Sequence, residues 1–187
     1  MLIHMNMVFI CGSLRKDSYN RKLMQLAMRY AAEQGAAVSE APIGHIPLYS
    51  ADLEQDPWPD SAKKFFDQVA ASDAVVIVSP EYNYSIPGVL KNAVDWASVG
   101  TNAWKDKAVA IMGMSTHQYG TTKMQMQLRQ ALIGTGPIWV IPQPQVAIGF
   151  AATALRADGT LSDPKMDERV RSLLENLFST VAKLRQP

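Results

Sequence analysis

Three short apolar runs limit what this chain can fold into more than any other feature of its sequence. They read MVFIC at residues 7–11, AVVIVS at 74–79 and AVAIMGM at 108–114. A strand with one face in water alternates apolar and polar residues, whereas a strand of a parallel sheet is covered on both faces and is apolar throughout. The runs therefore predict the buried strands of a parallel sheet.

Two further segments are weaker strand candidates. IWVI at 138–141 lies between Pro137 and Pro142, and AAVSEAPI at 36–43 follows Gly35. They bring the predicted sheet to five strands.

Between the strand candidates, the spacing of apolar residues changes to that of an amphipathic helix. The positions that recur at this spacing are Leu23, Leu26, Ala27, Tyr30 and Ala31; Ala62, Phe65, Phe66, Val69 and Ala70; Val89, Leu90, Ala93, Val94 and Ala97; and Met166, Val170, Leu173, Leu174, Leu177, Val181 and Leu184. Gly35 predicts the end of the first helix. Strands that alternate with helices indicate an α/β doubly wound sheet, and with no repeat or linker we expect residues 1–187 to form a single domain.

Two longer connections, 44–61 and 147–163, interrupt this alternation. Asp158-Gly159 in the second predicts the turn of a small hairpin. Long loops in α/β domains serve sites or interfaces about as often as they are plain surface, so their length alone assigns no function.

Composition indicates which classes of partner and which cellular compartment suit this chain. The formal net charge is +1, from 18 basic and 17 acidic residues, and lacks the basic excess typical of nucleic-acid binding. The single cysteine, Cys11, ends an apolar run, which predicts a buried packing residue and suits a reducing compartment. No secretory signal pattern precedes the first strand, and no apolar run reaches the roughly 18 residues of a membrane span. We expect a cytoplasmic protein.

The stretch GSLRKDSYN follows the first predicted strand and precedes a helix. In a doubly wound sheet, ligands bind outside the carboxyl ends of the strands, where unpaired N–H groups and the dipole of the next helix favour an anion. Ser13, Ser18 and Asn20 are neutral donors, and Arg15 can form a forked pair with phosphate oxygens. The alternative is that Ser18 only caps the helix while the other polar groups face water.

The same stretch excludes two common nucleotide motifs. It lacks the second and third glycines of the dinucleotide fingerprint, and it lacks the Lys-Ser or Lys-Thr pair of a Walker loop. A mononucleotide phosphate bound through side chains fits better.

A second polar stretch, SPEYNYSIPGVLKNAVDW at 79–96, follows the AVVIVS run. Pro80 and Pro87 stiffen its backbone, and its tyrosines and Asn83 offer flat surfaces and hydrogen bonds to a heterocycle. The alternative is a stiff turn whose tyrosines cover the core.

Together, GSLRKDSYNRKL and SPEYNYSIPGVLKNAVDW resemble the NAD(P)H-dependent FMN reductase family, which includes quinone, chromate and azo-dye reductases. The resemblance extends over nearly the whole chain. It implies a flavodoxin-like α/β three-layer sandwich, in which helices cover both faces of a five-stranded parallel sheet of order 2-1-3-4-5. It also implies FMN as cofactor and NAD(P)H as co-substrate.

The resemblance assigns site residues to both stretches. Ser13, Arg15, Ser18 and Asn20 would hold the FMN phosphate. The residues that would line the ribityl chain and the isoalloxazine ring are Pro80, Glu81, Tyr82, Asn83, Tyr84 and Ser85, largely through backbone groups. Ser115 would approach the flavin from the far side.

After Ser115 the chain departs from the family, because MSTHQYGTTK replaces a glycine-rich loop. His117 in this loop is a candidate proton donor, although lone loop histidines are more often solvated. Three histidines without clustered carboxylates or cysteines make a metal site unexpected.

The implied activity passes hydride from NAD(P)H through FMN to quinones or similar acceptors such as flavin, chromate or azo compounds, in alternating steps. No side chain need act as a general acid, so no catalytic residue is named. The alternatives are a flavodoxin-type electron carrier, which is generally strongly acidic, and a flavin-free regulatory protein of the same fold. The family also implies a homodimer or homotetramer; apolar Val89, Leu90, Val94 and Trp96 on more than one side of a helix fit either such an interface or internal packing.

Overall fold

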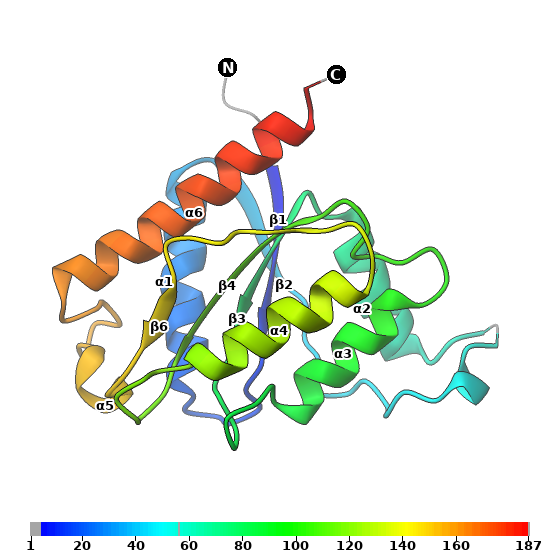
Figure 1. The fold of residues 1–187 in the computed structure, drawn as a ribbon, viewed down its shortest axis with the longest axis horizontal. Coiled ribbons are helices and arrows are strands. Elements are labelled where there is room, and N and C mark those ends of the chain that lie inside the picture. The colour runs from blue at the N-terminus through cyan, green and yellow to red at the C-terminus, as the bar shows by residue number, and fades with distance from the viewer. Residues whose placement is uncertain (1–4, 56, 187) are drawn as a thin grey trace.

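The apolar runs form the centre of a parallel sheet with helices on both faces (Figure 1). The computed structural model describes residues 5–55 and 57–186. The strands are β1 (Met5–Cys11), β2 (Ala36–Glu40), β3 (Ala74–Val78), β4 (Ala108–Met114), β5 (Trp139–Val140) and β6 (Val146–Ile148). The helices are α1 (Tyr19–Glu33), α2 (Asp60–Ala71), α3 (Gly88–Ser98), α4 (Thr122–Gly134), α5 (Ala151–Ala154) and α6 (Pro164–Leu184), with a 3-10 turn at Ala51–Leu53.

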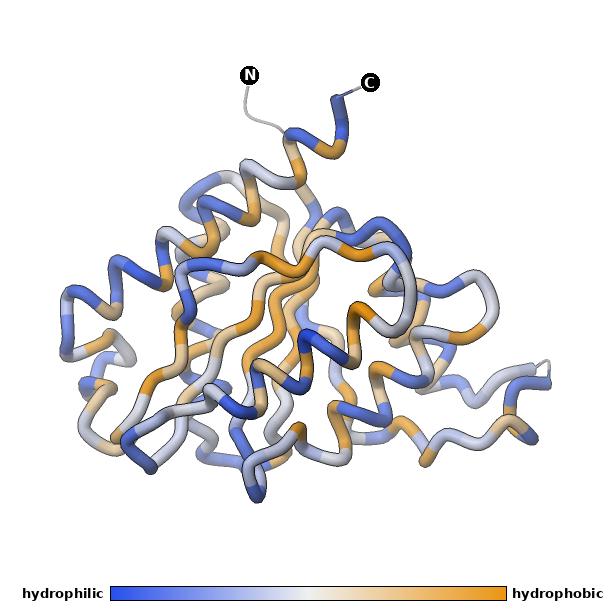
Figure 2. The backbone as a smooth tube through the Cα atoms, in the orientation of Figure 1, coloured by the Kyte–Doolittle hydropathy of each residue, from blue (hydrophilic) through white to orange (hydrophobic). Residues whose placement is uncertain are grey.

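Alternate residues of each central strand enter two separate cores. Met7 and Phe9 of β1 pack on the side of α1 and α6, whereas Val8 and Ile10 pack on the side of α2, α3 and α4. This two-sided burial explains why the central strands are almost entirely apolar, and Figure 2 shows the resulting apolar centre.

The strand order β2-β1-β3-β4-β5 is the predicted one, and every pairing is parallel. The fifth position, however, is divided. Trp139–Val140 pairs with the start of β4, and Val146–Ile148 pairs with its end. The expectation of five strands therefore becomes six, because the prolines at 142 and 144 interrupt the edge between the two short pairings.

Several local predictions are confirmed. Gly35 has a φ of 90° just after α1, and Leu155 and Leu161 form the bridge of a small hairpin around Asp158-Gly159. Cys11 is buried, and burial raises the pKa of its thiol. Helix α4 and strand β6 were not expected from the sequence. None of the helices in the described part of the chain is long and apolar enough to cross a membrane.

Candidate functional site

The loops that follow β1, β3 and β4 meet at the carboxyl end of the sheet. Val78 is paired with both Cys11 and Met112, so the three strands end side by side. Gly12 is required here, since a Cβ would lie 2.2 Å from Ser79 Oγ. A cavity of about 100 Å³ lies between the loops and is lined by Ser13, Arg15, Ser18, Tyr19, Asn20, Pro80, Glu81, Tyr82, Met114, Ser115 and Thr116.

Most of the residues predicted for the site therefore line one cavity. Asn83, Tyr84 and Ser85 are the exceptions, and they lie at the tip of the second loop. Tyr19, Met114 and Thr116 line the cavity without having been predicted. Adjacency to Ser18 and Ser115 is the only sequence signal for Tyr19, Met114 and Thr116.

Ser13 and Ser18 place two hydroxyl groups in the wall of the cavity. Ser13 is 2% exposed and Ser18 is 3% exposed. Ser13 Oγ accepts the Arg15 N–H at 3.3 Å, and Ser18 Oγ accepts the Arg21 N–H at 3.4 Å as the cap of α1. Neither hydroxyl hydrogen has an acceptor within residues 5–55 and 57–186. Capping thus uses one lone pair of Ser18 and leaves its proton available, so the capping and ligand-binding interpretations are compatible.

Asn20 also lines the cavity, but most of its side-chain amide is already used. Its Nδ2 donates to the Met114 carbonyl at 3.0 Å, and its Oδ1 accepts the Met114 N–H at 2.8 Å. These bonds fasten the first turn of α1 to the end of β4. Only the second Nδ2 hydrogen is left for a ligand.

Arg15 is the cation of the first loop that lines the cavity, whereas the neighbouring Lys16 is exposed and does not line it. The Arg15 side chain is exposed and has no ion pair with any residue that the structure describes. Arg21, in the first turn of α1, is instead paired with both carboxylate oxygens of Glu40, at 2.9 and 3.0 Å. The first loop therefore offers one guanidinium, two hydroxyls and the leading N–H groups of α1, a donor set suited to a phosphate.

The second loop ends in a tight turn from Tyr82 to Ser85. The two residues exchange main-chain hydrogen bonds at 3.1 and 2.9 Å, while Asn83 and Tyr84 between them have φ values of 49° and 64°. Tyr82 is 45% exposed and Tyr84 is 66% exposed. The alternative in which the tyrosines cover the core is therefore wrong.

Side chains of this turn contact α4 rather than the cavity. Glu81 Oε2 accepts the Met124 N–H at 2.9 Å, although other Glu81 atoms line the cavity. Ser85 Oγ donates to Gln127 Oε1 at 2.6 Å, and Lys123 Nζ lies 3.5 Å from the centroid of the Tyr84 ring. The second loop therefore faces the cavity mainly with its backbone and with Pro80 and Tyr82.

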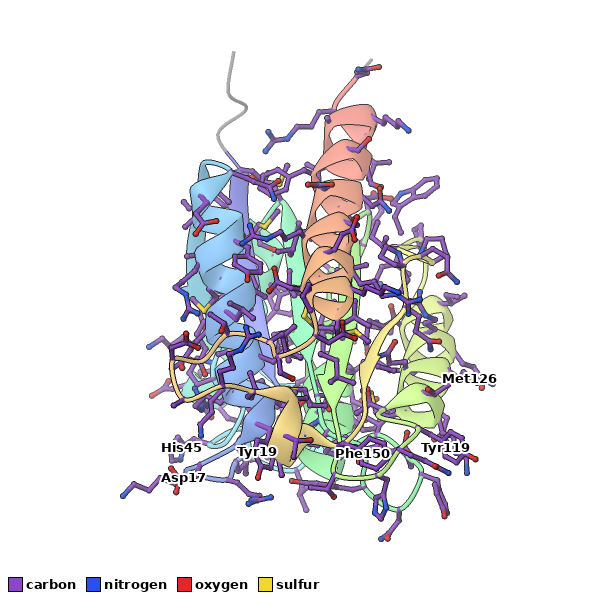
Figure 3. All side chains as sticks on the ribbon, turned by 90° about the vertical axis from the view of Figure 1, so that its left-hand side faces the viewer. Asp17, Tyr19, His45, Tyr119, Met126 and Phe150 are labelled. Atoms are coloured by element: carbon purple, nitrogen blue, oxygen red, sulfur yellow. The ribbon has the colours of Figure 1, made fainter. Side chains whose placement is uncertain are left out.

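The third loop is held against β6 and α5. Ser115 donates its N–H to Ile148 and accepts the Ala151 N–H, at 2.9 and 3.0 Å. Phe150, between these partners, is 60% exposed and has a left-handed backbone with a φ of 47°. Figure 3 shows Phe150 and Tyr119 at the same end of the molecule as Tyr19 and Asp17. Phe150 could not be predicted from the sequence, because its conformation is set by contacts with the third loop.

Several known proteins are similar to this chain in sequence or fold. The family model described as NADPH-dependent FMN reductase matches residues 5–153. An NAD(P)H-dependent FMN reductase from Pseudomonas aeruginosa is 38% identical over 177 residues, which cover 94% of this chain and 95% of the relative. A quinone reductase from Pseudomonas putida is 38% identical over 156 residues, or 82% of this chain and 83% of the relative. The solved structure of the flavoenzyme NAD(P)H:acceptor oxidoreductase FerB from Paracoccus denitrificans has a TM-score of 0.86 at 35% identity, covering 96% of this chain and 98% of that one.

Proposed function

The chain belongs to the NADPH-dependent FMN reductase family, and from this premise we propose how its residues hold the flavin and receive the electron acceptor. It is an FMN-dependent oxidoreductase that uses NAD(P)H and reduces quinones or similar small acceptors. The redox chemistry, hydride acceptance from the nicotinamide and electron transfer to the acceptor, would be supplied by bound FMN. The protein supplies binding, orientation and electrostatics.

The phosphate of FMN is assigned to the first loop. The observation that carries this assignment is the pair of nearly fully buried hydroxyls, Ser13 and Ser18, whose protons have no acceptor among the described residues. Buried donors without partners are uncommon, and a phosphate oxygen would satisfy them. Arg15 would add a charge-assisted contact, and Asn20 would contribute its remaining amide hydrogen.

The ring and ribityl chain of FMN are assigned to the second and third loops. Pro80, Glu81 and Tyr82 line the cavity opposite the phosphate loop, and Ser115 closes it from the end of β4. Asn83, Tyr84 and Ser85 would act through the backbone of the turn, since the side chain of Ser85 is bonded to α4. Main-chain N–H groups in such a turn can stabilise negative charge on a reduced ring.

The acceptor is proposed to bind between exposed aromatic side chains at the mouth of the site. Tyr82, Tyr119 and Phe150 are 45%, 73% and 60% exposed. Exposed aromatic rings beside a cofactor site offer flat apolar surfaces, which suit a planar acceptor such as a quinone. Nicotinamide and acceptor would then use the same opening in turn.

The chain is further proposed to act in the cytoplasm as a homodimer or homotetramer. The apolar residues of α3 do not support this, because Leu90, Val94 and Trp96 are buried within the chain itself. The support comes from α4, where Met126 and Ile133, two turns apart, are 64% and 62% exposed. Light scattering coupled to size exclusion would measure the mass in solution, and a monomer that stays monomeric with FMN would contradict this part.

The visible absorption spectrum tests the function as a whole. We expect the purified protein to show oxidised-flavin bands, or to acquire them with FMN. Anaerobic NADPH should bleach these bands, and a quinone should restore them. If no flavin binds after incubation with FMN, the proposed function is wrong. If the bands bleach but no small acceptor restores them, an electron carrier becomes the better interpretation.

A further inference from the structure

Helix α4 begins without the features that usually stabilise a helix N-terminus. The side chain of its N-cap, Thr121, makes no capping hydrogen bond, and the first turn contains no acidic residue. The first turn instead carries Lys123, whose charge is unfavourable at the positive end of the helix dipole. These features alone would leave the N-terminus of α4 weakly stabilised.

The second site loop supplies what α4 lacks. Glu81 accepts the Met124 N–H at 2.9 Å, so one carboxylate provides both the missing acceptor and the missing negative charge. Lys123 lies over the Tyr84 ring, 3.5 Å from its centroid. A cation over the face of an aromatic ring is attracted to it, and this attraction offsets the unfavourable position of the Lys123 charge in the first turn.

In return, α4 holds the Tyr82–Ser85 turn. Gln127 accepts the Ser85 hydroxyl hydrogen at 2.6 Å and donates to the Tyr84 carbonyl at 2.8 Å. Asn83 and Tyr84 are two consecutive non-glycine residues in left-handed conformations. Such conformations persist only where surrounding contacts fix them, and they concentrate at functional sites. The main-chain bonds between Tyr82 and Ser85 close the turn, and the contacts from Gln127 hold it from outside.

We propose that Lys123 and Gln127 are positioning residues that hold the flavin-ring loop in its binding conformation. This inference rests on the proposed function, because it takes the Tyr82–Ser85 turn as the ring-binding loop. Neither Lys123 nor Gln127 lines the cavity. Both act through Tyr84 and Ser85, by removing alternative conformations of the turn before FMN arrives.

Substitutions at two positions of α4 test the proposal, with a third as control. Gln127→Ala removes both hydrogen bonds to the turn and should weaken FMN binding about tenfold. Lys123→Met removes the cation and should weaken it about threefold, whereas Lys123→Arg keeps a cation over the ring and should restore wild-type affinity. Gln130→Ala is the control, because Gln130 lies one turn further along α4, exposed and with no hydrogen bond among the described residues.

FMN titrated into the flavin-free full-length chain gives the dissociation constants, and hydrogen exchange of the same chain reports the turn without any flavin. In Gln127→Ala, the amides of Tyr82 and Ser85 should exchange faster, while those in the middle of α4 remain as protected as in wild type. Equal FMN affinity and equal exchange in wild type and Gln127→Ala would overturn the proposal while leaving the reductase function intact. An equal loss in Gln130→Ala would also overturn it, since the effect would then belong to the helix. Failure of the wild type to bind FMN would instead overturn the proposed function, and the positioning role with it.

Discussion

The two ends of the sheet treat their polar groups in opposite ways. At the amino end, Lys107 Nζ donates to the carbonyls of Ala70 and Ser72, at 2.7 and 2.6 Å, and Asp73 accepts the Asn6 N–H at 2.7 Å. Asp73 is also paired with Arg185 at 2.5 Å. At the carboxyl end, the hydroxyl protons of Ser13 and Ser18 have no acceptor among the described residues.

Backbone strain distinguishes the two ends by residue type. Asn102 and Asp106, which precede β4 at the amino end, have left-handed conformations that asparagine and aspartate tolerate, whereas Tyr84 and Phe150, on the loops at the carboxyl end, adopt this conformation with side chains that disfavour it. One end of the sheet is thus closed by contacts within the protein, and the other holds donors and conformations that a ligand can use. The difference locates function without reference to any single motif.

The largest effect is expected at Arg15, the arginine that lines the cavity at the carboxyl end of the sheet. Arg15→Ala should weaken FMN binding by about 1.5–3 kcal/mol, the value of a hydrogen bond to a charged group. FMN titration measures it, with Arg29→Ala as the control because Arg29 is an exposed arginine further along α1. Unchanged affinity would remove Arg15 from the phosphate site.

Gly113 tests whether the carboxyl end of the sheet is closely packed beneath its loops. A Cβ at this position would lie 2.1 Å from the Ser79 carbonyl oxygen and 2.7 Å from Thr121 Oγ1. Gly113→Ala should therefore lower the free energy of unfolding by about 1–3 kcal/mol. Urea denaturation measures the change, and Gly88→Ala is the matched control, because nothing lies within 4 Å of a Cβ there. Equal stability of the two variants would show that the strand ends can move apart.

Phe150 tests whether backbone strain at the carboxyl end of the sheet contributes to binding of the electron acceptor. Phe150→Asn places a residue that tolerates the left-handed conformation at an exposed position, so it should raise the free energy of unfolding by about 1 kcal/mol. The KM for a quinone should rise at the same time, because a ring beside the site is lost. Tyr119→Asn also removes an exposed ring, but it relieves no left-handed backbone and should leave stability unchanged. A Phe150→Asn variant that is less stable than wild type would contradict this account.

The smallest effect is expected at the closed end. Burial opposes ionisation of Asp73, but the Asn6 N–H and Arg185 outweigh it and hold the pKa of this carboxyl below its usual range. A carboxyl group whose pKa is lower in the folded than in the unfolded state stabilises the fold. This stabilisation is fully present at a pH above the unfolded-state pKa, and it is lost as the pH falls through the folded-state pKa. Asp73→Asn should therefore lose less stability than wild type between about pH 5 and pH 3, by at most about 1 kcal/mol because solvent screens the pair. Chemical unfolding across this range is the measurement. Glu175→Gln, at an exposed position on α6, should leave the pH dependence as in wild type.

The sequence predicts elements whose burial pattern is regular and misses those whose pattern is broken. Strands β3 and β4, and β1 from Met7 to Cys11, contain no polar side chain, so their sequences predict them. Helix α4 was missed because its buried face contains Gln125, whose amide donates to the Val146 carbonyl and to Thr121 Oγ1. A buried glutamine looks like a surface residue until its partners are known.

The features of the site also divide into those that the sequence predicts and those that it does not. The strand-end loops and their donors could be predicted, because the carboxyl end of a parallel sheet is a general ligand position. The contacts of Glu81 and Ser85 with α4 could not be predicted, since they join residues 43 and 42 positions apart and the sequence does not predict that helix. The left-handed backbone of Tyr84 and Phe150 was equally hidden, because tyrosine and phenylalanine carry no sequence signal for that conformation.

The divided fifth position of the sheet has a consequence for how the molecule behaves when crowded. A long, flat edge strand can recruit a strand of another molecule and start aggregation. Here that edge consists of pairings two and three residues long, Trp139–Val140 and Val146–Ile148, which are separated by a proline-containing segment. Neither is long enough to serve as a template for an added strand. The interruption therefore favours solubility at high concentration, although it contributes nothing to the cofactor site.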